Sequence, residues 1–120
     1  MIKQVIVIRK DLKMRRGKEI AQGSHASVAF LAQHVRDGTP LTEAEKEWIN
    51  GHFTKVCLQV DSEDQLLEVH KKCQDAGVRS ILITDRGLTE FDGKPTNTCI
   101  GVGPDEASKI DAITGHLKLY

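Results

Sequence analysis

The alternation of short apolar runs with longer helical patterns constrains this chain more than any other feature. The first run, Gln4 to Ile8 (QVIVI), is almost continuously apolar and rich in β-branched residues. A run of this kind is typical of a central strand that is buried on both faces of a sheet. Two later runs have the same character, and a weaker fourth run follows them. The predicted strands cover residues 4–8, 54–60, 80–84 and 98–102.

A long helix is predicted between the first two strands, from Gly17 to about Arg36. Apolar and small residues recur there at helical spacing, so one side of the helix is apolar. We expect that side to pack against the sheet. Its members are Ile20, Ala21, Ser24, Val28, Leu31, Ala32 and Val35.

Shorter helices are predicted from the residues that begin them. Thr42 with Glu45, and Ser62 with Gln65, have the spacing of a capping box, which satisfies open N–H groups in the first turn of a helix. Pro104 suits the first position of a last helix, because the N–H that proline lacks goes unused there. Strands therefore alternate with helices, which predicts a layered α/β domain.

The strand connections predict a mixed sheet. Crossovers through a helix join parallel strands, so the first three strands should run the same way. Residues 85–96 hold no helical pattern, so the fourth strand should return antiparallel. The carboxyl ends of strands one and three then share one edge of the sheet with the start of strand four. Ligands of α/β proteins usually bind at such an edge.

Charge is balanced overall but uneven along the chain. The 120 residues hold 17 Lys and Arg against 17 Asp and Glu, and this length is typical of one domain. In residues 1–18, however, seven basic residues accompany a single Asp. Cations at the start of a helix oppose its dipole, so this concentration predicts either an anion site or a solvated basic loop. We call the following residues the basic cluster: Arg9, Lys10, Lys13, Arg15, Arg16 and Lys18.

Several other chemistries have no support in the sequence. Cys57, Cys73 and Cys99 lack paired spacing and lie in apolar patterns, so we expect buried free thiols. Motifs of phosphate-binding loops, dinucleotide sites, zinc proteases and serine esterases are absent, so neither a metal nor a cofactor is predicted. The first apolar run is too short for a membrane span and carries no signal-peptide pattern, so we expect a soluble, cytoplasmic protein.

Two groups of polar residues are candidates for a site. At about 100° per residue, Lys18, Gln22 and His25 fall in one narrow stripe at the border of the apolar side of the long helix. A lone histidine at such a position is more often structural, but the three residues together indicate a site.

The second group follows the third strand. Asp85 stands at the carboxyl end of that strand, where a carboxylate either acts on water as a base or orienting group, or starts an Asx turn. Thr89 lies in the loop after it. Thr96 and Thr98 open the fourth strand at the same edge, where their hydroxyls either donate hydrogen bonds or simply favour β structure.

Five segments, in order, resemble blocks of the peptidyl-tRNA hydrolases of the second type, and they span nearly the whole chain. These are QVIVIRKDLKM, RGKEIAQGSHA, TDRGLTE, KPTNTCIGVGP and KIDAITGHLKLY. The resemblance implies one domain over residues 1–120 with three layers, in which helices flank both faces of a mixed four-stranded sheet. It also implies hydrolysis of the ester that joins a peptide to the terminal ribose of tRNA, with peptidyl-tRNA as the partner.

The resemblance implies roles for individual residues as well. We expect a water-mediated reaction in which Asp85 orients or deprotonates water, Lys18 neutralises negative charge, and the other catalytic residues fix the geometry. The expected catalytic residues are Lys18, Gln22, His25, Asp85 and Thr89. The expected tRNA-binding residues are Arg9, Lys10, Lys13, Arg15, Arg16, Thr96 and Thr98.

Two alternative functions stay open at this point. The chain could be a tRNA-binding or protein-interaction module that keeps the fold without turnover, or a hydrolase of another acyl ester or amide. A homodimer is left open too.

Overall fold

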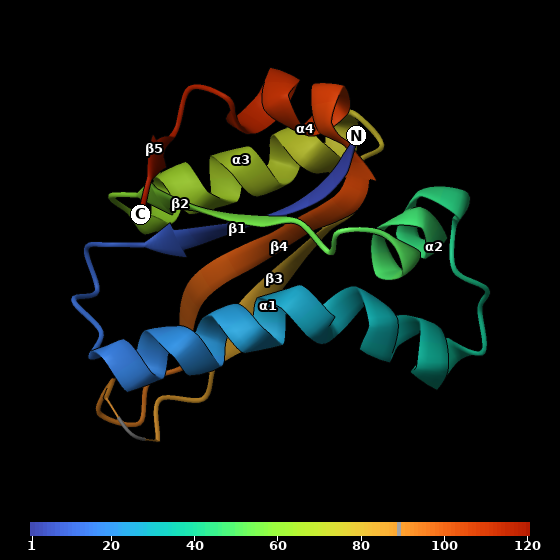
Figure 1. The fold of residues 1–120 in the computed structure, drawn as a ribbon. Coiled ribbons are helices and arrows are strands. Elements are labelled where there is room, and N and C mark those ends of the chain that lie inside the picture. The colour runs from blue at the N-terminus through green and yellow to red at the C-terminus, as the bar shows by residue number, and fades with distance from the viewer. Residues whose placement is uncertain (89) are drawn as a thin grey trace.

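Five strands form one sheet in the order β3-β4-β1-β2-β5 in the computed structural model, which describes residues 1–88 and 90–120 (Figure 1). The strands are β1 (Ile2–Arg9), β2 (Lys55–Val60), β3 (Ser80–Asp85), β4 (Thr96–Glu106) and β5 (Lys118–Leu119). The helices are α1 (Arg16–Asp37), α2 (Glu43–Asn50), α3 (Glu63–Asp75) and α4 (Ala107–Thr114).

The central strand β1 is buried on both faces, as its apolar run predicts. Val5 and Val7 belong to one core cluster, and Ile6 and Ile8 belong to another. β1 pairs in parallel with β2 and antiparallel with β4, and β3 pairs antiparallel with β4. The first three strands therefore run the same way, and the predicted mixed α/β sheet is confirmed. The predicted number of strands was too low by one, because β5 has only two residues and forms no apolar run.

Helices cover both faces of the sheet (Figure 1). α3 and α4 lie on one face, where Leu66 and Ile110 join the cluster around Val5. α1 and α2 lie on the other face, where the rings of Phe30 and Trp48 meet edge to face with their centres 5.8 Å apart. The arrangement has the three layers that the resemblance implies. Among the described residues, no helix combines the length and the apolar character that crossing a membrane requires.

The last helix begins later than the sequence predicts. Pro104 lies within β4, which continues to Glu106 and pairs there with Ile2 of β1. The prediction that Pro104 opens the helix was therefore wrong. Strand pairing prevails at this position because it gives the backbone at the start of β1 a hydrogen-bonding partner, which a helix from Pro104 would not provide.

α1 buries a different side from the one that its apolar residues predict, so that prediction was wrong. The buried residues are Gln22, Ala26, Phe30 and His34. The large apolar residues left exposed are Ile20, Val28, Leu31 and Val35.

Close packing and satisfied polar groups explain this orientation of α1. Ala26 of α1 lies against Gly101 of β4. A Cβ atom on residue 101 would collide with the Ala26 carbonyl, so the glycine allows the helix to approach the sheet closely. Gln22 accepts a hydrogen bond from Thr98 at 2.6 Å, and both ring nitrogens of His34 have polar partners within 2.8 Å. Buried polar side chains that keep their hydrogen bonds cost little, so the helix can bury this side.

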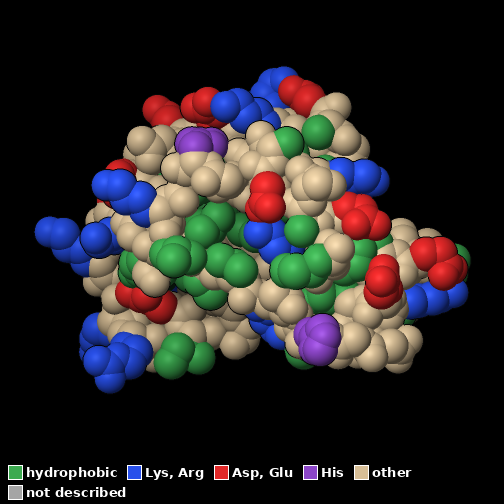
Figure 2. Space-filling view, turned by 45° about the horizontal axis from the view of Figure 1, so that its top comes forward, with side chains coloured by type: hydrophobic (Ala, Val, Ile, Leu, Met, Phe, Trp, Pro, Cys, Tyr) green, Lys and Arg blue, Asp and Glu red, His purple; other side chains and the backbone are tan. Residues whose placement is uncertain are grey.

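The apolar side of α1 borders a groove, and hydrophobic side chains gather along the middle of this face (Figure 2). The groove lies between α1 and the face of the sheet on which Lys55 and Cys57 of β2 are exposed. This exposure of Cys57 contradicts the expectation of a buried thiol, whereas Cys73 and Cys99 are buried as expected. The apolar groove residues include Ile6, Ile8, Ile20, Val28, Cys57 and Tyr120.

A buried ionic network holds α2 in place. The predicted capping box is present, because Thr42 accepts from the Glu45 N–H at 3.1 Å and Glu45 accepts from the Thr42 N–H at 2.8 Å. The Glu45 carboxylate also contacts His34 of α1 at 2.8 Å and Arg79, just before β3, at 3.1 Å. Burial by itself would raise the pKa of Glu45, but the bonds from Thr42 and His34 and the charge of Arg79 outweigh it and lower the pKa. Glu45 therefore anchors α2 to two other elements.

Replacing Glu45 with Ala should lower the free energy of unfolding by about 2–4 kcal/mol, because it removes the cap of α2 and deprives Arg79 of its buried carboxylate. The matched control is Glu43→Ala in the same helix, where the side chain is 93% exposed. This control should change the free energy by less than about 0.5 kcal/mol. Urea unfolding followed by circular dichroism measures both, and equal effects would show that the network does not anchor α2.

Candidate active site

The predicted ligand-binding edge of the sheet carries a cleft of about 330 Å³. β1 and β3 end at this edge and β4 begins there. The first turns of α1 form one wall of the cleft, and the end of β3 with its following loop forms the other. The lining residues are Lys18, Gln22, His25, Thr84, Asp85, Arg86 and Leu88. The first polar group found in the sequence therefore meets Asp85 of the second group in one place.

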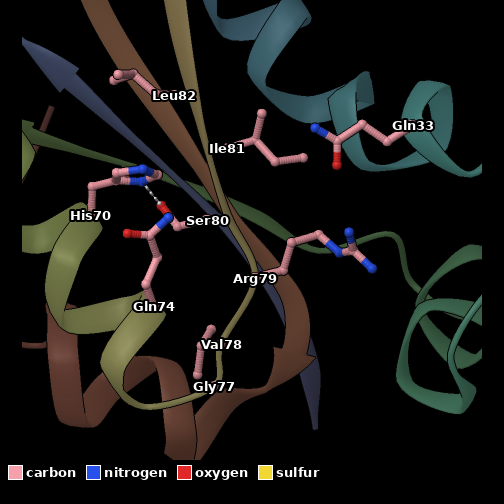
Figure 3. Close-up of a pocket in the computed structure, with 9 residues that line it drawn as sticks. All are labelled: Gln33, His70, Gln74, Gly77, Val78, Arg79, Ser80, Ile81 and Leu82. Atoms are coloured by element: carbon pink, nitrogen blue, oxygen red, sulfur yellow. Dashed lines mark hydrogen bonds between the residues drawn. The ribbon is translucent and has the colours of Figure 1, made fainter.

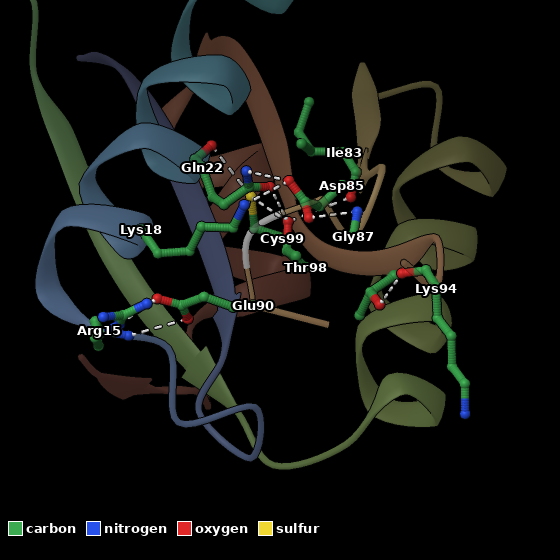
Figure 4. A network of polar contacts seen from close by, with 11 residues as sticks. Arg15, Lys18, Gln22, Ile83, Asp85, Gly87, Glu90, Lys94, Thr98 and Cys99 are labelled. Atoms are coloured by element: carbon green, nitrogen blue, oxygen red, sulfur yellow. Dashed lines mark hydrogen bonds and ion pairs between the residues drawn. The ribbon is translucent and has the colours of Figure 1, made fainter. Parts of the chain in front are cut away.

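An ion pair between Lys18 and Asp85 forms the centre of the cleft (Figure 4). Lys18 Nζ lies 2.7 Å from Asp85 Oδ1, and each side chain is only 13% exposed. Such partial withdrawal from water strengthens the attraction relative to a pair on the open surface. A lysine in the first turn of α1 opposes the helix dipole, and the carboxylate opposite it offsets that cost.

Gln22 joins this ion pair to the sheet. Its Nε2 donates to Asp85 Oδ1 at 3.2 Å, and its Oε1 accepts from the Thr98 hydroxyl at 2.6 Å. Because the hydroxyl donates to the amide oxygen, the NH₂ group of Gln22 is directed toward Asp85. Thr98 has no exposed surface, so it reaches the cleft only through Gln22.

Asp85 makes the Asx turn with one carboxylate oxygen and turns the other toward the cleft. Its Oδ2 accepts from the Gly87 N–H at 2.8 Å, which makes the Asx turn, while Oδ1 faces Lys18 and Gln22. Gly87 has a φ of 81°, and a Cβ atom there would collide with the Lys94 backbone. The hydrogen bond from Lys18, with help from the Gly87 N–H and the lysine charge, outweighs burial and lowers the pKa of Asp85. Asp85 is therefore ionised at neutral pH.

The other predicted residues at this edge differ in placement. His25 lines the cleft with an exposed side chain. Thr96 lies opposite Asp85 in the pairing of β3 with β4, and its hydroxyl donates to the Lys94 carbonyl at 2.9 Å. Thr89 lies outside the residues that the structure describes, so its role stays a prediction.

The basic cluster has members with internal partners and members on the surface. Arg9 is 11% exposed in its side chain and donates to the carboxylate of Asp11 and the carbonyl of Asn97. Arg15 pairs with Glu90 at 2.8 Å, although its side chain is 82% exposed. The other exposed members are Lys10, Lys13 and Arg16.

Two residues beside the cleft had no signal in the sequence. Glu90 bonds with Arg15 across 75 positions of the chain, and the hydrogen bond from Arg15 is the largest cause of the lowered pKa of Glu90. The ring centre of Phe91 lies 5.7 Å from Lys18 Nζ, close enough for a cation–π contact. Both follow Asp85 in a loop without periodic pattern, where only the fold reveals which residues turn inward.

Comparisons with known proteins identify the family of this chain and a structure with a similar fold. The family model of Peptidyl-tRNA hydrolase PTH2 matches residues 2–120. A Methanopyrus kandleri protein named peptidyl-tRNA hydrolase is 41% identical over 99% of this chain and 98% of its own length. A Nanoarchaeum equitans protein of the same name is 42% identical over the full length of both. A Dictyostelium discoideum protein named probable peptidyl-tRNA hydrolase 2 is 39% identical over 98% of this chain and 54% of its own length.

A solved structure of an Agrobacterium protein of unknown function is similar with a TM-score of 0.63. The two sequences are 14% identical, and the superposition covers 99% of this chain and 97% of that one, so the likeness shows a shared fold alone. The full-length family match and the archaeal relatives confirm the resemblance found in the sequence, and the chain belongs to the peptidyl-tRNA hydrolase PTH2 family.

Proposed function

We propose that this chain hydrolyses the ester of peptidyl-tRNA in the cleft that Lys18, Gln22 and Asp85 form, with water as the attacking group. Membership of a family of peptidyl-tRNA hydrolases supplies the reaction class. The observation that carries the assignment to this cleft is the 2.7 Å ion pair between Lys18 and Asp85, which is partly withdrawn from water at the ligand-binding edge of the sheet.

Asp85 is better suited to orient water than to deprotonate it. Its lowered pKa makes it a weak base at neutral pH. A carboxylate has about four lone-pair positions, and Lys18, Gln22 and Gly87 use three of them. The remaining position can accept a hydrogen bond from the attacking water and direct its oxygen toward the ester carbonyl.

Lys18 supplies the positive charge that the reaction requires. Attack by water gives a tetrahedral intermediate whose former carbonyl oxygen is negative, and a preorganised ammonium group stabilises such an oxyanion. When the intermediate collapses, the bond to the ribose oxygen breaks and that oxygen takes up the proton lost by the attacking water. The peptide leaves as a carboxylic acid, which releases its remaining proton to solvent and becomes a carboxylate. His25 lines the same cleft, and we assign to its side chain the transfer of the proton from water to the ribose oxygen.

The surface beside the cleft supports binding of tRNA phosphates. Lys13 and Arg16 are exposed at the entry to α1, where the helix dipole also attracts anions. Arg9 is held by internal acceptors, so we assign it a supporting role. The cytoplasm is the proposed location, because translation supplies the substrate there. A homodimer stays a prediction.

A tRNA-binding module without turnover is the second candidate, and the ion pair argues against it. Removing Lys18 and Asp85 from water costs free energy that phosphate binding on the surface does not require. The discriminating assay follows release of tRNA from N-acetyl-aminoacyl-tRNA and from unacetylated aminoacyl-tRNA. Cleavage of the first alone supports the proposed function, cleavage of both indicates a general esterase, and cleavage of neither supports the binding module.

Replacing Asp85 with Asn should lower kcat by about 10²- to 10⁴-fold, because asparagine keeps the size and the Asx turn but removes the charge. Lys18→Ala should have a similar effect, and the double variant should be far less impaired than the product of the two. Asp92→Asn, an exposed carboxylate in the same loop, is the matched control and should leave kcat unchanged. Near-normal kcat/KM in folded Asp85→Asn would end the role proposed for this residue.

The pH dependence of stability tests whether Asp85 is ionised throughout the neutral range. Since folding lowers its pKa, its contribution is fully present above the unfolded-state pKa and is lost as the pH falls through the lower folded-state pKa. The difference in unfolding free energy between the wild type and Asp85→Asn should stay constant from pH 7 to about 5 and shrink below about pH 4. A difference that instead grows as the pH falls from 7 to 5 would indicate that folding raises the pKa of Asp85, and would favour a general base.

Charge reversal of Lys13 and Arg16 to Glu should raise KM more than it lowers kcat, because remote phosphate contacts act equally on bound substrate and transition state. The matched control reverses Lys71 and Lys72 on α3, across the sheet from α1. For the wild type, the logarithm of tRNA affinity should fall with the logarithm of salt concentration with a slope of about −2 to −3. Equal effects of the two reversals, or an affinity insensitive to salt, would place the phosphate contacts elsewhere.

A further inference from the structure

A second groove, of about 640 Å³, runs along the outer edge of β3 (Figure 3). β3 is an end strand of the sheet, and β4 is its one strand partner among the described residues. The groove lies between α1, which contributes Gln33, and α3, which contributes His70 and Gln74. Figure 3 shows the side chain of Ile81 pointing toward α1 and that of Ser80 toward α3. The backbone edge of β3 therefore faces the groove between the two helices.

The backbone of this edge is available for pairing. The Gly103 N–H donates to the Arg79 carbonyl at 2.9 Å, so Arg79 belongs to a hydrogen-bonded pair with β4. Backbone groups alternate in direction along an antiparallel strand, so those of Ile81 also point to β4. The N–H and C=O groups of Ser80 and Leu82 therefore point outward into the groove. Proteins usually protect such edges with Lys, Pro or a covering segment, and residues 80–84 contain neither Lys nor Pro.

The groove and the candidate active site lie in succession along β3. The same strand continues to Thr84 and Asp85, which line the cleft. Gln33 of α1 forms the wall of the groove opposite α3. It lies on the same side of α1 as Lys18 and His25, because residues 18, 22, 25, 29 and 33 fall within an arc of about 80° at 100° per residue. A register shift in the pairing with β4, between Ile83 and Thr84, comes just before the residues of β3 that line the cleft.

We propose that the peptide part of the substrate binds along β3 as an added strand, parallel to it, with its carboxyl-terminal ester in the cleft beside Lys18 and Asp85. This inference rests on the proposed function. The direction follows from the position of the cleft, because the carboxyl end of the peptide must lie at the carboxyl end of β3. Main-chain hydrogen bonds to Ser80 and Leu82 recognise a peptide without reading its sequence, which suits a substrate whose peptide varies.

The spacing along β3 sets how long a peptide must be to form main-chain hydrogen bonds with Leu82 and Ser80. Leu82 precedes Asp85 by three residues, or about 10 Å at about 3.3 Å per residue. The third or fourth residue from the ester therefore reaches Leu82, and the fifth or sixth reaches Ser80. An N-acetyl-aminoacyl group is too short to reach the groove, so it forms none of these hydrogen bonds.

Substrates of defined length and backbone test this binding mode. Hexapeptidyl-tRNA should have a kcat/KM about tenfold or more above that of N-acetyl-aminoacyl-tRNA, as several main-chain hydrogen bonds would give. In an added strand, alternate N–H groups face β3. N-methylation of the peptide N–H groups that face β3 should therefore abolish the increase in kcat/KM, while N-methylation of those that face away should leave the increase unchanged. Equal effects of both patterns would overturn strand addition.

A pair of variants tests the same contact from the protein side. Leu82→Pro removes the outward N–H, and edge strands tolerate proline where that group faces away from the sheet. Leu82→Ala loses the same side-chain packing but keeps the N–H, so it is the matched control. Relative to Leu82→Ala, Leu82→Pro should lose roughly threefold to tenfold in kcat/KM on hexapeptidyl-tRNA and nothing on N-acetyl-aminoacyl-tRNA.

Three outcomes would overturn the inference and remain distinct from failure of the proposed function. A wild type that cleaves both substrates with equal kcat/KM has no peptide site along β3. Equal kcat/KM of Leu82→Pro and Leu82→Ala on the long substrate excludes the Leu82 contact. A dimer in sedimentation that Leu82→Pro alone dissociates, without change in length preference, would assign the edge to a second copy of this chain. Failure of the proposed function would instead abolish cleavage of every substrate.

Discussion

The rotation of α1 about its own axis is the constraint on which the rest of this structure depends. Ala26 packs directly on the backbone of Gly101, which sets the distance of the helix from the sheet. Hydrogen bonds at Gln22 and His34, three turns apart, then lock its orientation. Because Lys18 lies one turn before Gln22 on the same side, the rotation that buries the polar side of α1 also aims Lys18 into the cleft.

The cleft combines two charges that are each unfavourable where they stand. Lys18 sits in the first turn of a helix, against the dipole, and Asp85 is largely withdrawn from water. Together they offset one another, and Gln22 holds the carboxylate from the side of the sheet. The result is a preorganised positive group and a fixed acceptor at one edge of the sheet, which is the arrangement that a reaction with a developing oxyanion requires.

β3 joins the chemistry of the cleft to the rest of the surface. Its carboxyl end delivers Asp85, while its outer edge remains open between two helices of opposite layers. The position of β3 at the end of the sheet follows from topology, because β4 inserts between β1 and β3. A buried central strand would also have presented Asp85, but it would have had no free edge leading to it.

The sequence by itself determined the four longer strands, their directions, the caps at Thr42 and Ser62, and four polar residues that line the cleft, Lys18, Gln22, His25 and Asp85. These features depend on local pattern, which acts over a few neighbouring residues. Only the tertiary structure decided which side of α1 is buried and that Thr98 orients Gln22, because the partners are 76 positions apart in the chain. Apolar periodicity counts side chains by polarity alone, whereas burial of a polar side chain depends on whether a distant residue completes its hydrogen bonds.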